Sequence, residues 1–214
     1  MLLCEGTWQL AAQAFRAIGR GQLISWTGVA LCCLLLSDAI GREPLPPTVS
    51  AVSAIALAEG QAKVYFTPWD DAEGAIMRAV RNARSEVLVQ AYSFTSGAIA
   101  GELINARKRG VDVRVTADQN ETERIPTSRI SHLARSGIPV WLESRYQAAH
   151  NKVMVIDADA ALPVVVTGSY NWTVAAQRRN SENVLIISGN SGLARAYKAN
   201  WERHRLDALP YMLK

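Results

Sequence analysis

The stretch from residue 150 to residue 171 constrains this chain more than any other. Residues 153–156 and 164–166 are two runs of β-branched and apolar side chains, which predict a buried strand and its returning partner. His150 and Lys152 come just before and at the start of the first run, two residues apart, which places both side chains on one face of an extended chain. The second run ends in a glycine-containing polar turn. We therefore expect this pair of strands to carry polar groups to one edge of a sheet.

The polar groups that would meet at this edge suit a particular kind of ligand. Gly168, Ser169 and Asn171 follow the second run, so a hydroxyl and an amide would join the histidine and the lysine. No cluster of carboxylates accompanies them, which favours an anion that is attacked over a metal ion that is held. The sequence therefore predicts a binding site for a phosphate ester.

These residues resemble the signature of the phospholipase D superfamily, His-x-Lys-x4-Asp followed by Gly-Ser-x-Asn. In this chain the signature corresponds to His150, Lys152, Asp157, Gly168, Ser169 and Asn171. The resemblance also takes in residues 91–95, 107–113 and 180–183, so it covers roughly residue 61 to the C-terminus. It is strongest for the small bacterial endonucleases of that superfamily, which carry one copy of the motif per chain.

One departure from the family pattern lies between the two halves of the signature. Ten residues separate Asp157 from Gly168, where the family usually has about six, and the extra length falls in residues 158–163. We expect this insertion to lengthen the turn between two strands, where extra residues are tolerated.

The principal motif residues also have simpler interpretations. A lone histidine is usually a buried side chain satisfied by a neighbour, and Lys152 could be an ordinary strand lysine; their spacing favours a nucleophile and a phosphate ligand. Gly-Ser-x-Asn forms turns in many proteins, so phosphate contacts for Ser169 and Asn171 depend on the histidine and lysine that precede them.

The remaining candidates are two acidic and two basic residues. Asp157 ends an apolar strand, where a structural ion pair or a turn cap is expected rather than direct catalysis. The resemblance implies that Glu182 lies beside the histidine and holds its tautomer, although it could be a surface glutamate before a strand. Arg178 and Arg179 are a solvated pair by default and candidates for contact with a polynucleotide backbone.

The single copy of the motif bears on mechanism. One histidine cannot act as attacking nucleophile and as leaving-group acid in the same step. The resemblance implies a homodimer whose shared active site uses His150 of one subunit as nucleophile and His150 of the other as acid, then base. Lys152, Asn171 and Ser169 would neutralise the phosphoryl oxygens, and no metal or other cofactor is implied.

Three functions remain open at this point. The leading one is a nonspecific endonuclease on DNA, with RNA as a further candidate substrate, because nothing in the chain resembles a base-reading module. The alternatives are a membrane-associated phospholipase D that hydrolyses phospholipid headgroups and a nucleic-acid-binding module without activity.

The charge of the chain lies in its second part. Three of the 23 basic and three of the 19 acidic residues precede Glu59, so the rest of the chain carries the whole formal charge of +4. This excess of positive charge suits an anionic substrate.

The first 58 residues differ from the rest. Residues 23–36 form an apolar segment behind Arg16 and Arg20, as in a secretory signal, with possible cleavage after Ala39 or Ala58; an uncleaved membrane anchor is the alternative. We thus expect a signal or anchor with a linker over 1–58, and a catalytic domain over 59–214. That domain would work in the periplasm or outside the cell, or else anchored in the inner membrane. All three cysteines precede residue 40, which excludes a cysteine nucleophile from the catalytic domain.

Periodicity beyond residue 59 predicts alternating strands and helices. We expect strands at 63–66, 86–92, 111–116, 138–142 and 183–188, besides the two already described, and helices at 70–84, 97–108, 130–136, 173–178 and 193–206. Residues 118–127 are polar and contain Pro126, which predicts a loop. The fold class expected from this order is α/β, with a mixed β-sheet flanked by helices.

Overall fold

The structure is a computed structural model that describes residues 60–213. The apolar segment at 23–36, both candidate cleavage sites, the linker and the expected boundary at residue 59 lie outside the described residues. Within residues 60–213, no helix has the length and apolar character needed to cross a bilayer.

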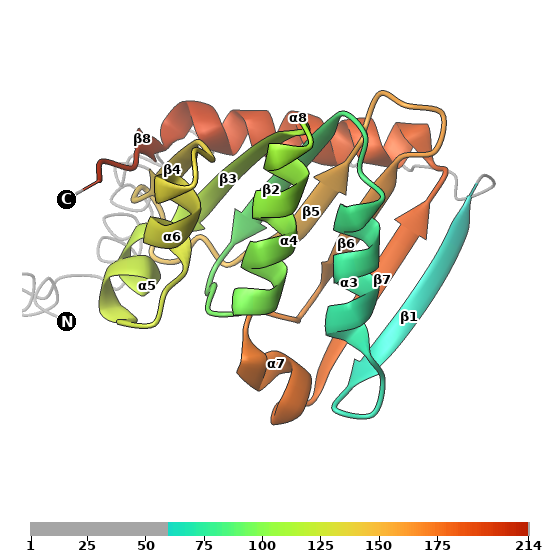
Figure 1. Ribbon diagram of the computed structural model, residues 1–214, viewed down its shortest axis with the longest axis horizontal. Coiled ribbons are helices and arrows are strands. Elements are labelled where there is room, and N and C mark those ends of the chain that lie inside the picture. Colours follow the sequence, from blue (N-terminus) through green and yellow to red (C-terminus); the bar gives the residue numbers. More distant parts are fainter. Residues whose placement is uncertain (1–59, 214) are drawn as a thin grey trace, which may run out of the picture. The chain divides into compact units, whose positions relative to one another are not determined.

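One mixed sheet organises the described part of the chain, with strand order β1-β7-β6-β5-β2-β3-β4-β8 (Figure 1). The strands β2, β3 and β4 run parallel to one another, and every other neighbouring pair is antiparallel. The strands are β1 (Gln61–Thr67), β2 (Glu86–Ala91), β3 (Asp112–Asp118), β4 (Val140–Glu143), β5 (Lys152–Ile156), β6 (Val164–Gly168), β7 (Glu182–Ser188) and β8 (Leu209–Pro210). The expected mixed sheet is confirmed.

Helices cover both faces of this sheet. They are α3 (Ala72–Arg81), α4 (Gly97–Lys108), α5 (Gln119–Arg124), α6 (Ile130–Arg135), α7 (Val174–Arg178) and α8 (Ser191–Asp207). Side chains from α3, α4, α6 and α7 pack with one face of the sheet in a first core cluster, and α8 packs against the other face through Ala194 and Trp201. Figure 1 shows α3 and α4 in front of the strands and α8 on the far side.

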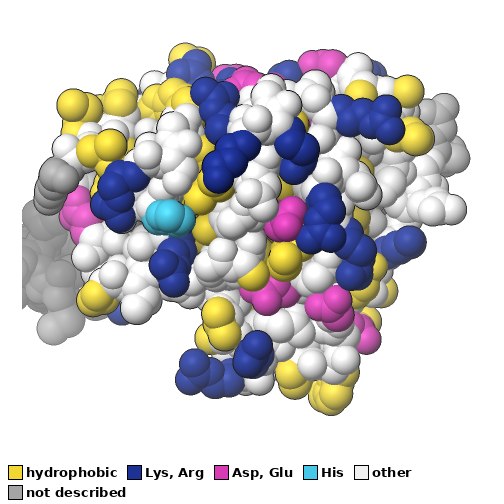
Figure 2. All heavy atoms as spheres, in the orientation of Figure 1, with side chains coloured by type: hydrophobic (Ala, Val, Ile, Leu, Met, Phe, Trp, Pro, Cys, Tyr) yellow, Lys and Arg dark blue, Asp and Glu magenta, His cyan; other side chains and the backbone are white. Residues whose placement is uncertain are grey.

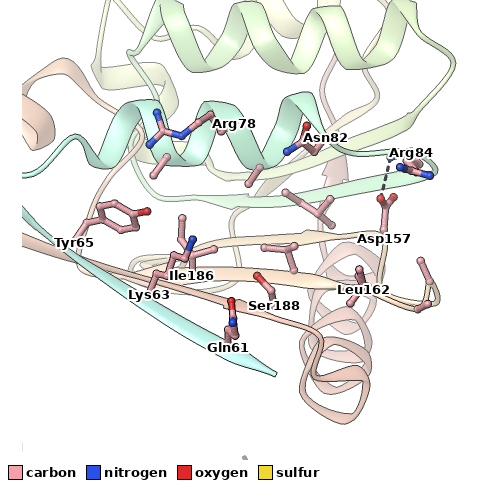
Figure 3. A pocket seen from close by; sticks show the side chains of 16 residues that line it. Gln61, Lys63, Tyr65, Arg78, Asn82, Arg84, Asp157, Leu162, Ile186 and Ser188 are labelled. Atoms are coloured by element: carbon pink, nitrogen blue, oxygen red, sulfur yellow. Dashed lines mark hydrogen bonds between the residues drawn. The ribbon is translucent and has the colours of Figure 1, made fainter. Parts of the chain in front are cut away.

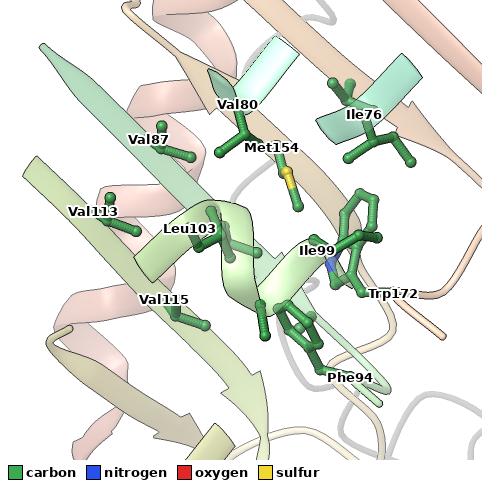
Figure 4. Close-up of a cluster of buried hydrophobic side chains, with 14 of the residues drawn as sticks. Ile76, Val80, Val87, Phe94, Ile99, Leu103, Val113, Val115, Met154 and Trp172 are labelled. Atoms are coloured by element: carbon green, nitrogen blue, oxygen red, sulfur yellow. The ribbon is translucent and has the colours of Figure 1, made fainter. Parts of the chain in front are cut away.

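The central strand β5 is buried along its whole length between these two layers. Its residues alternate, so Met154 joins the first cluster together with Val87, Leu103 and Trp172 (Figure 4), whereas Val153 and Val155 join the second. A strand buried on both faces needs the continuous apolar run that the sequence contains. The buried lysine at its first position is therefore an exception that requires a reason.

Local signals explain most helix boundaries. The Asp71 carboxylate accepts a hydrogen bond from the Gly74 backbone N–H and caps α3, and the Ser96 hydroxyl accepts one from Ile99 and caps α4. Ile76 and Val80, on the inner face of α3, are fully buried. The helices predicted at 97–108, 130–136, 173–178 and 193–206 are all confirmed within two residues at each end.

The loop predicted at 118–127 is wrong over most of its length. Residues Gln119–Arg124 form α5, which the Asp118 carboxylate caps by accepting a hydrogen bond of 2.7 Å from the Glu121 backbone N–H. Pro126 lies just beyond this short helix and does not interrupt it. The sequence did not indicate this helix because the segment has no apolar face, and Glu121 is the one residue of α5 that is buried.

Asp157 lies at the opposite end of β5 from Lys152, in the left-handed backbone region at φ 51°. Its carboxylate accepts hydrogen bonds from the backbone N–H groups of Arg84, Ser85 and Glu86 and from the Ser85 hydroxyl, at 2.7 to 2.9 Å. Burial alone would raise the pKa of this carboxyl, but these hydrogen bonds outweigh it and hold the pKa below its ordinary value. This geometry is the basis for the structural role predicted for Asp157.

Replacing Asp157 by alanine should therefore lower the free energy of unfolding by about 2 to 4 kcal/mol, because four donors lose a charged acceptor. A group with a depressed pKa stabilises the protein above its unfolded pKa, and that stabilisation is lost as pH falls through the folded pKa. Urea unfolding at pH 7 and pH 3 measures both effects. We expect the folded fraction to keep the wild-type specific activity; a folded but inactive variant would contradict the structural role.

Candidate active site

Strands β5 and β6 bring the two halves of the motif to one edge of the sheet, as expected. The two strands pair antiparallel with Val153 opposite Thr167, so residues before β5 lie beside residues after β6. On its other side, β5 pairs with β2, and Lys152 lies opposite Ala91. The start of β5, the end of β6 and the end of β2 therefore form a common edge.

His150 is exposed at this edge, and its imidazole makes no hydrogen bond to any residue in 60–213. Its ring centroid lies 4.3 Å from that of Tyr92. The segment before it is fixed, because the Ala149 backbone N–H donates a hydrogen bond of 2.8 Å to the buried Asp118 carboxylate. A positioned imidazole with both ring nitrogens free can act as a nucleophile or exchange a proton.

Lys152 is the buried exception in β5, with 6% of its surface exposed. Its Nζ atom donates a hydrogen bond of 2.7 Å to the His150 carbonyl oxygen and lies 4.8 Å from the centroid of the Tyr92 ring. Burial lowers the pKa of this ammonium group to about 8, although the Glu182 and Glu121 carboxylates favour its charged form. A desolvated ammonium beside His150 is well placed to bind an anion.

The turn after β6 presents alternate side chains to the site. Tyr170 and Trp172 are each 1% exposed and point into the core, so Ser169 and Asn171 face the opposite way. The Trp172 indole N–H donates to the Gln90 carbonyl at 3.0 Å, and the Trp172 carbonyl accepts from Thr95 and Ser96, which pins the turn to the end of β2. Two buried aromatic side chains thus hold Asn171 at the site.

Asn171 has an unsatisfied side chain. Its Oδ1 atom is buried and has no hydrogen-bond partner among the described residues. A buried amide left without a partner costs stability, and such groups are kept where they bind a ligand or water. Since the carboxamide carries two donors besides this acceptor, it suits an anion at this position.

Gly168 allows the close approach of β6 to β7. Its φ is +149°, and a Cβ atom there would lie 2.2 Å from the Asn183 carbonyl oxygen. Any other residue would force the strands apart. The neighbouring Ser169 hydroxyl donates to Glu182 Oε2 at 2.6 Å and accepts from the Asn183 backbone N–H at 3.1 Å.

The contacts of Glu182 differ from those that the resemblance implies. Its carboxylate accepts hydrogen bonds from Ser169 and from the Asn180 side chain, and none from His150 among the described residues. Its charge favours the protonated form of Lys152 and so partly opposes the lowering of that pKa by burial. The interaction with the histidine stays a prediction. Ser169 directs its only hydroxyl proton at Glu182, so it links Glu182 to the Gly-Ser-x-Asn turn.

Arg178 and Arg179 lie at the end of α7, between Asn171 and Glu182 in the chain. Both are exposed, and neither side chain has a hydrogen bond or ion pair within residues 60–213. The α7 backbone is anchored to β1, where the Thr67 hydroxyl donates to the Ala176 carbonyl at 2.7 Å. The two side chains thus lack an intramolecular partner in the described part of the chain, and their contact with a substrate stays a prediction.

Three residues of the site were not predicted as members of it. Tyr92 contacts both His150 and Lys152, Asp118 holds the backbone before His150, and the buried Glu121 carboxylate acts on Lys152. Burial, with the nearby Glu121 and Asp118 carboxylates, raises the pKa of the Tyr92 phenol. Two of them could have been predicted from their positions in the chain, since Tyr92 and Asp118 stand at the carboxyl ends of two neighbouring strands.

Other candidates lie away from the catalytic edge. Trp141 packs edge-on against Trp201, whereas Tyr146 is 42% exposed and lies beside His204. His204 is paired with Glu143 at 2.6 Å. Among residues 60–213, no group of three or more His, Cys, Asp or Glu side chains could hold a metal ion.

Comparison with known proteins agrees with this geometry. Residues 76–205 match the family described as cardiolipin synthase, PLD-like domain. A phospholipase D of Rickettsia bellii is 33% identical over 156 residues, which are 73% of this chain and 75% of that protein. A mitochondrial cardiolipin hydrolase of Xenopus laevis is 28% identical over 209 residues, covering 94% of this chain and 91% of that one.

A solved structure shares both the fold and the sequence. The crystal structure of Nuc, a phospholipase D family member from Salmonella typhimurium, is 31% identical and aligns with a TM-score of 0.67 over 72% of this chain and 99% of that one. The fold, the sequence motif and the sequence identity to these proteins therefore support the same family. The chain belongs to the phospholipase D superfamily and is a phosphodiester hydrolase.

Proposed function

We propose that this hydrolase is a nonspecific endonuclease that cleaves DNA through a covalent phosphohistidine at His150, with RNA as a further substrate to be tested. The observation that carries the proposal is the exposed imidazole of His150, free of hydrogen bonds within residues 60–213, beside the buried ammonium of Lys152. A phosphodiester would meet a nucleophile and a desolvated cation at the same point.

The reaction would have two steps. An imidazole nitrogen of His150 bonds to phosphorus as the bond to the leaving oxygen breaks, and that oxygen takes a proton from His150 of the second copy. The second imidazole, now neutral, then takes a proton from water as the water oxygen attacks phosphorus and the nitrogen–phosphorus bond breaks. Lys152 and the Asn171 amide would balance the charge that develops on the phosphoryl oxygens.

Charge supports a polynucleotide as the substrate. The excess of basic residues falls after residue 58, and the exposed Arg178 and Arg179, which follow Asn171 in the chain, have no ion pair within residues 60–213. A polynucleotide binds through its phosphates, and a protein that reads no bases needs only such cations.

Turnover of plasmid DNA, RNA and phospholipid vesicles by the full chain, in the presence of EDTA, tests the proposal. We expect nicking and then fragmentation of DNA without sequence preference. EDTA should cause no loss of activity, since Lys152 supplies a positive charge and Asn171 supplies hydrogen bonds to the phosphoryl oxygens. A strict requirement for a divalent cation would contradict this mechanism.

The second candidate is a phospholipase D that acts on phospholipid headgroups. The names of the Rickettsia and Xenopus relatives favour it, because both refer to lipid substrates. Faster turnover of phosphatidylcholine or cardiolipin vesicles than of DNA would establish this candidate. In either case the chemistry at His150 would be the same, so the substrate assay separates them cleanly.

The shared site predicts that an inactive copy suppresses an active one. When wild-type and His150→Ala chains are coexpressed in equal amounts, random pairing leaves about a quarter of the dimers with two intact histidines. We expect activity per active chain to fall by about half, because only wild-type pairs work. Differently tagged chains allow each pair to be purified and assayed. A mixed pair with half the wild-type activity would indicate independent sites instead.

A further inference from the structure

A groove separates α3 from β1 at the end of the sheet opposite His150 (Figure 3). This α3–β1 groove has a volume of about 700 Å³, and its floor is formed by apolar side chains of β5, β6 and β7, among them Ile156 and Ile186. Those residues lie on the same face of the sheet as Lys152, because alternate positions of a strand share a face. The helix layer thus leaves the outer strands partly uncovered.

The polar lining of the groove is basic. Lys63 enters it from β1, Arg78 from α3 and Arg84 from the turn after α3. The side chains of Lys63 and Arg84 have no hydrogen bond or ion pair among the described residues, and Arg78 has only an exposed pair with Asp71 at 3.3 Å. Figure 2 shows several Lys and Arg side chains over α3 and toward β1, together with Asp and Glu side chains toward the lower end of α3.

The cations that line the groove outnumber its acidic side chains three to one. Asp157 is the only carboxylate among the lining residues, and both of its oxygens are occupied by the hydrogen bonds to residues 84–86. The other polar lining groups, which include Gln61, Asn82 and Ser188, are amides and hydroxyls. Such cations, amides and hydroxyls are the groups that contact the phosphates of nucleic acids.

The insertion predicted from the motif spacing builds one wall of this groove. Ala160, Ala161 and Leu162 belong to the lining, and Leu162 is 77% exposed. The lengthened turn between β5 and β6 thus deepens a basic hollow far from the catalytic edge.

We propose that the α3–β1 groove is a second binding site for the phosphodiester backbone of a polynucleotide, an inference that rests on the endonuclease function proposed above. From Lys152 to Ile156, β5 spans four residue steps, or about 13 Å. A strand of duplex DNA advances about 3.4 Å per nucleotide, so the groove would contact phosphates at least about four nucleotides from the cleaved one.

β1 offers a route between the groove and the site. Lys63 lies at its groove end, and Thr67 at the other end bonds to α7, which carries Arg178 and Arg179. Cations therefore stand toward both ends of one strand, and the Asp70 and Glu182 carboxylates also lie at its Thr67 end. A single lipid headgroup would occupy one phosphate position and leave this spread of cations unused, whereas a polynucleotide presents phosphates along the whole distance.

A charge-reversed variant, Lys63→Glu with Arg84→Glu, tests the proposal in the full chain. The matched control is Lys108→Glu with Arg203→Glu, which makes the same change of charge at exposed residues outside the groove. We expect the groove variant to raise KM and Kd for a 30-base-pair duplex by about tenfold or more, with kcat unchanged. Its slope of log Kd against log salt should fall by about two, since two phosphate contacts are lost.

A small diester and a short oligonucleotide complete the test. Turnover of bis(p-nitrophenyl) phosphate and of a trinucleotide should be equal in all three proteins, because neither substrate reaches the groove. Equal duplex affinity for the groove and control variants would overturn the inference, as would a groove variant that loses vesicle binding and keeps DNA binding. If the wild type cleaves the small diester but no nucleic acid, the endonuclease function fails, and fluorescence anisotropy with the duplex still decides on the groove.

Discussion

Replacing His150 by alanine is expected to lower kcat by about 10⁴-fold or more on DNA and on a small phosphodiester alike. The reason is that the proposed covalent bond to phosphorus forms at the His150 imidazole, whereas the nearby Ser169 hydroxyl donates its proton to Glu182. The imidazole is exposed and makes no hydrogen bond within residues 60–213, so the thermal midpoint should change by no more than about 2 °C. Single-turnover kinetics and thermal unfolding measure the two effects.

The matched control is His132→Ala, which removes an exposed histidine on α6. We expect it to keep wild-type kinetics. Residual activity of His150→Ala within about tenfold of the wild type would show that another residue is the nucleophile.

Replacing Lys152 by methionine is expected to lower kcat/KM by about 100- to 1000-fold, because the phosphoryl oxygens lose a desolvated positive charge. The thermal stability of this variant, in contrast, should not decrease. A buried ammonium costs free energy that an apolar side chain of similar length does not, so the variant should unfold at an equal or higher temperature at pH 7. A residue kept at the expense of stability is one that serves function.

The Lys152 pKa of about 8 sets the pH dependence of both effects. Because this pKa is lowered on folding, the unfolded chain holds the proton more tightly, and wild-type stability gains relative to the methionine variant as pH rises from about 8 to about 10.5. The wild-type kcat/KM should decline as pH rises through about 8, since the amine loses its charge. A methionine variant that is much less stable than the wild type at pH 7 would contradict this account.

Local patterns predicted most of the fold, because they set most of its elements directly. The apolar run before Asp157 is long enough only for a strand, and the carboxylate or hydroxyl caps of α3 and α4 mark their first turns. The helix at Gln119–Arg124 was not predicted because only one of its residues is buried, so it has no apolar periodicity. The strand β8 has two residues, which is too short for a periodic pattern.

The candidate site was predictable only in part, for a different reason. The pairing of His150 and Lys152 follows from their two-residue spacing, but Tyr92 meets them because β2 lies next to β5 in the sheet. Asp118 reaches Ala149 across 31 positions of sequence, through the order of β5, β2 and β3. Strand order is decided by packing of the whole sheet, so no local pattern contains these contacts.

The covalent intermediate itself is the most direct test of the central claim. A ³²P-labelled oligonucleotide is mixed with excess enzyme, the reaction is stopped in base within the first turnover, and the labelled peptide is sequenced by mass spectrometry. Phosphorus bound to an imidazole nitrogen is stable in base and lost in acid, unlike a phosphoserine. We predict label on the peptide that contains His150, removed by acid and absent from His150→Ala. Full turnover with no label on that peptide, or label on a serine, would contradict the account.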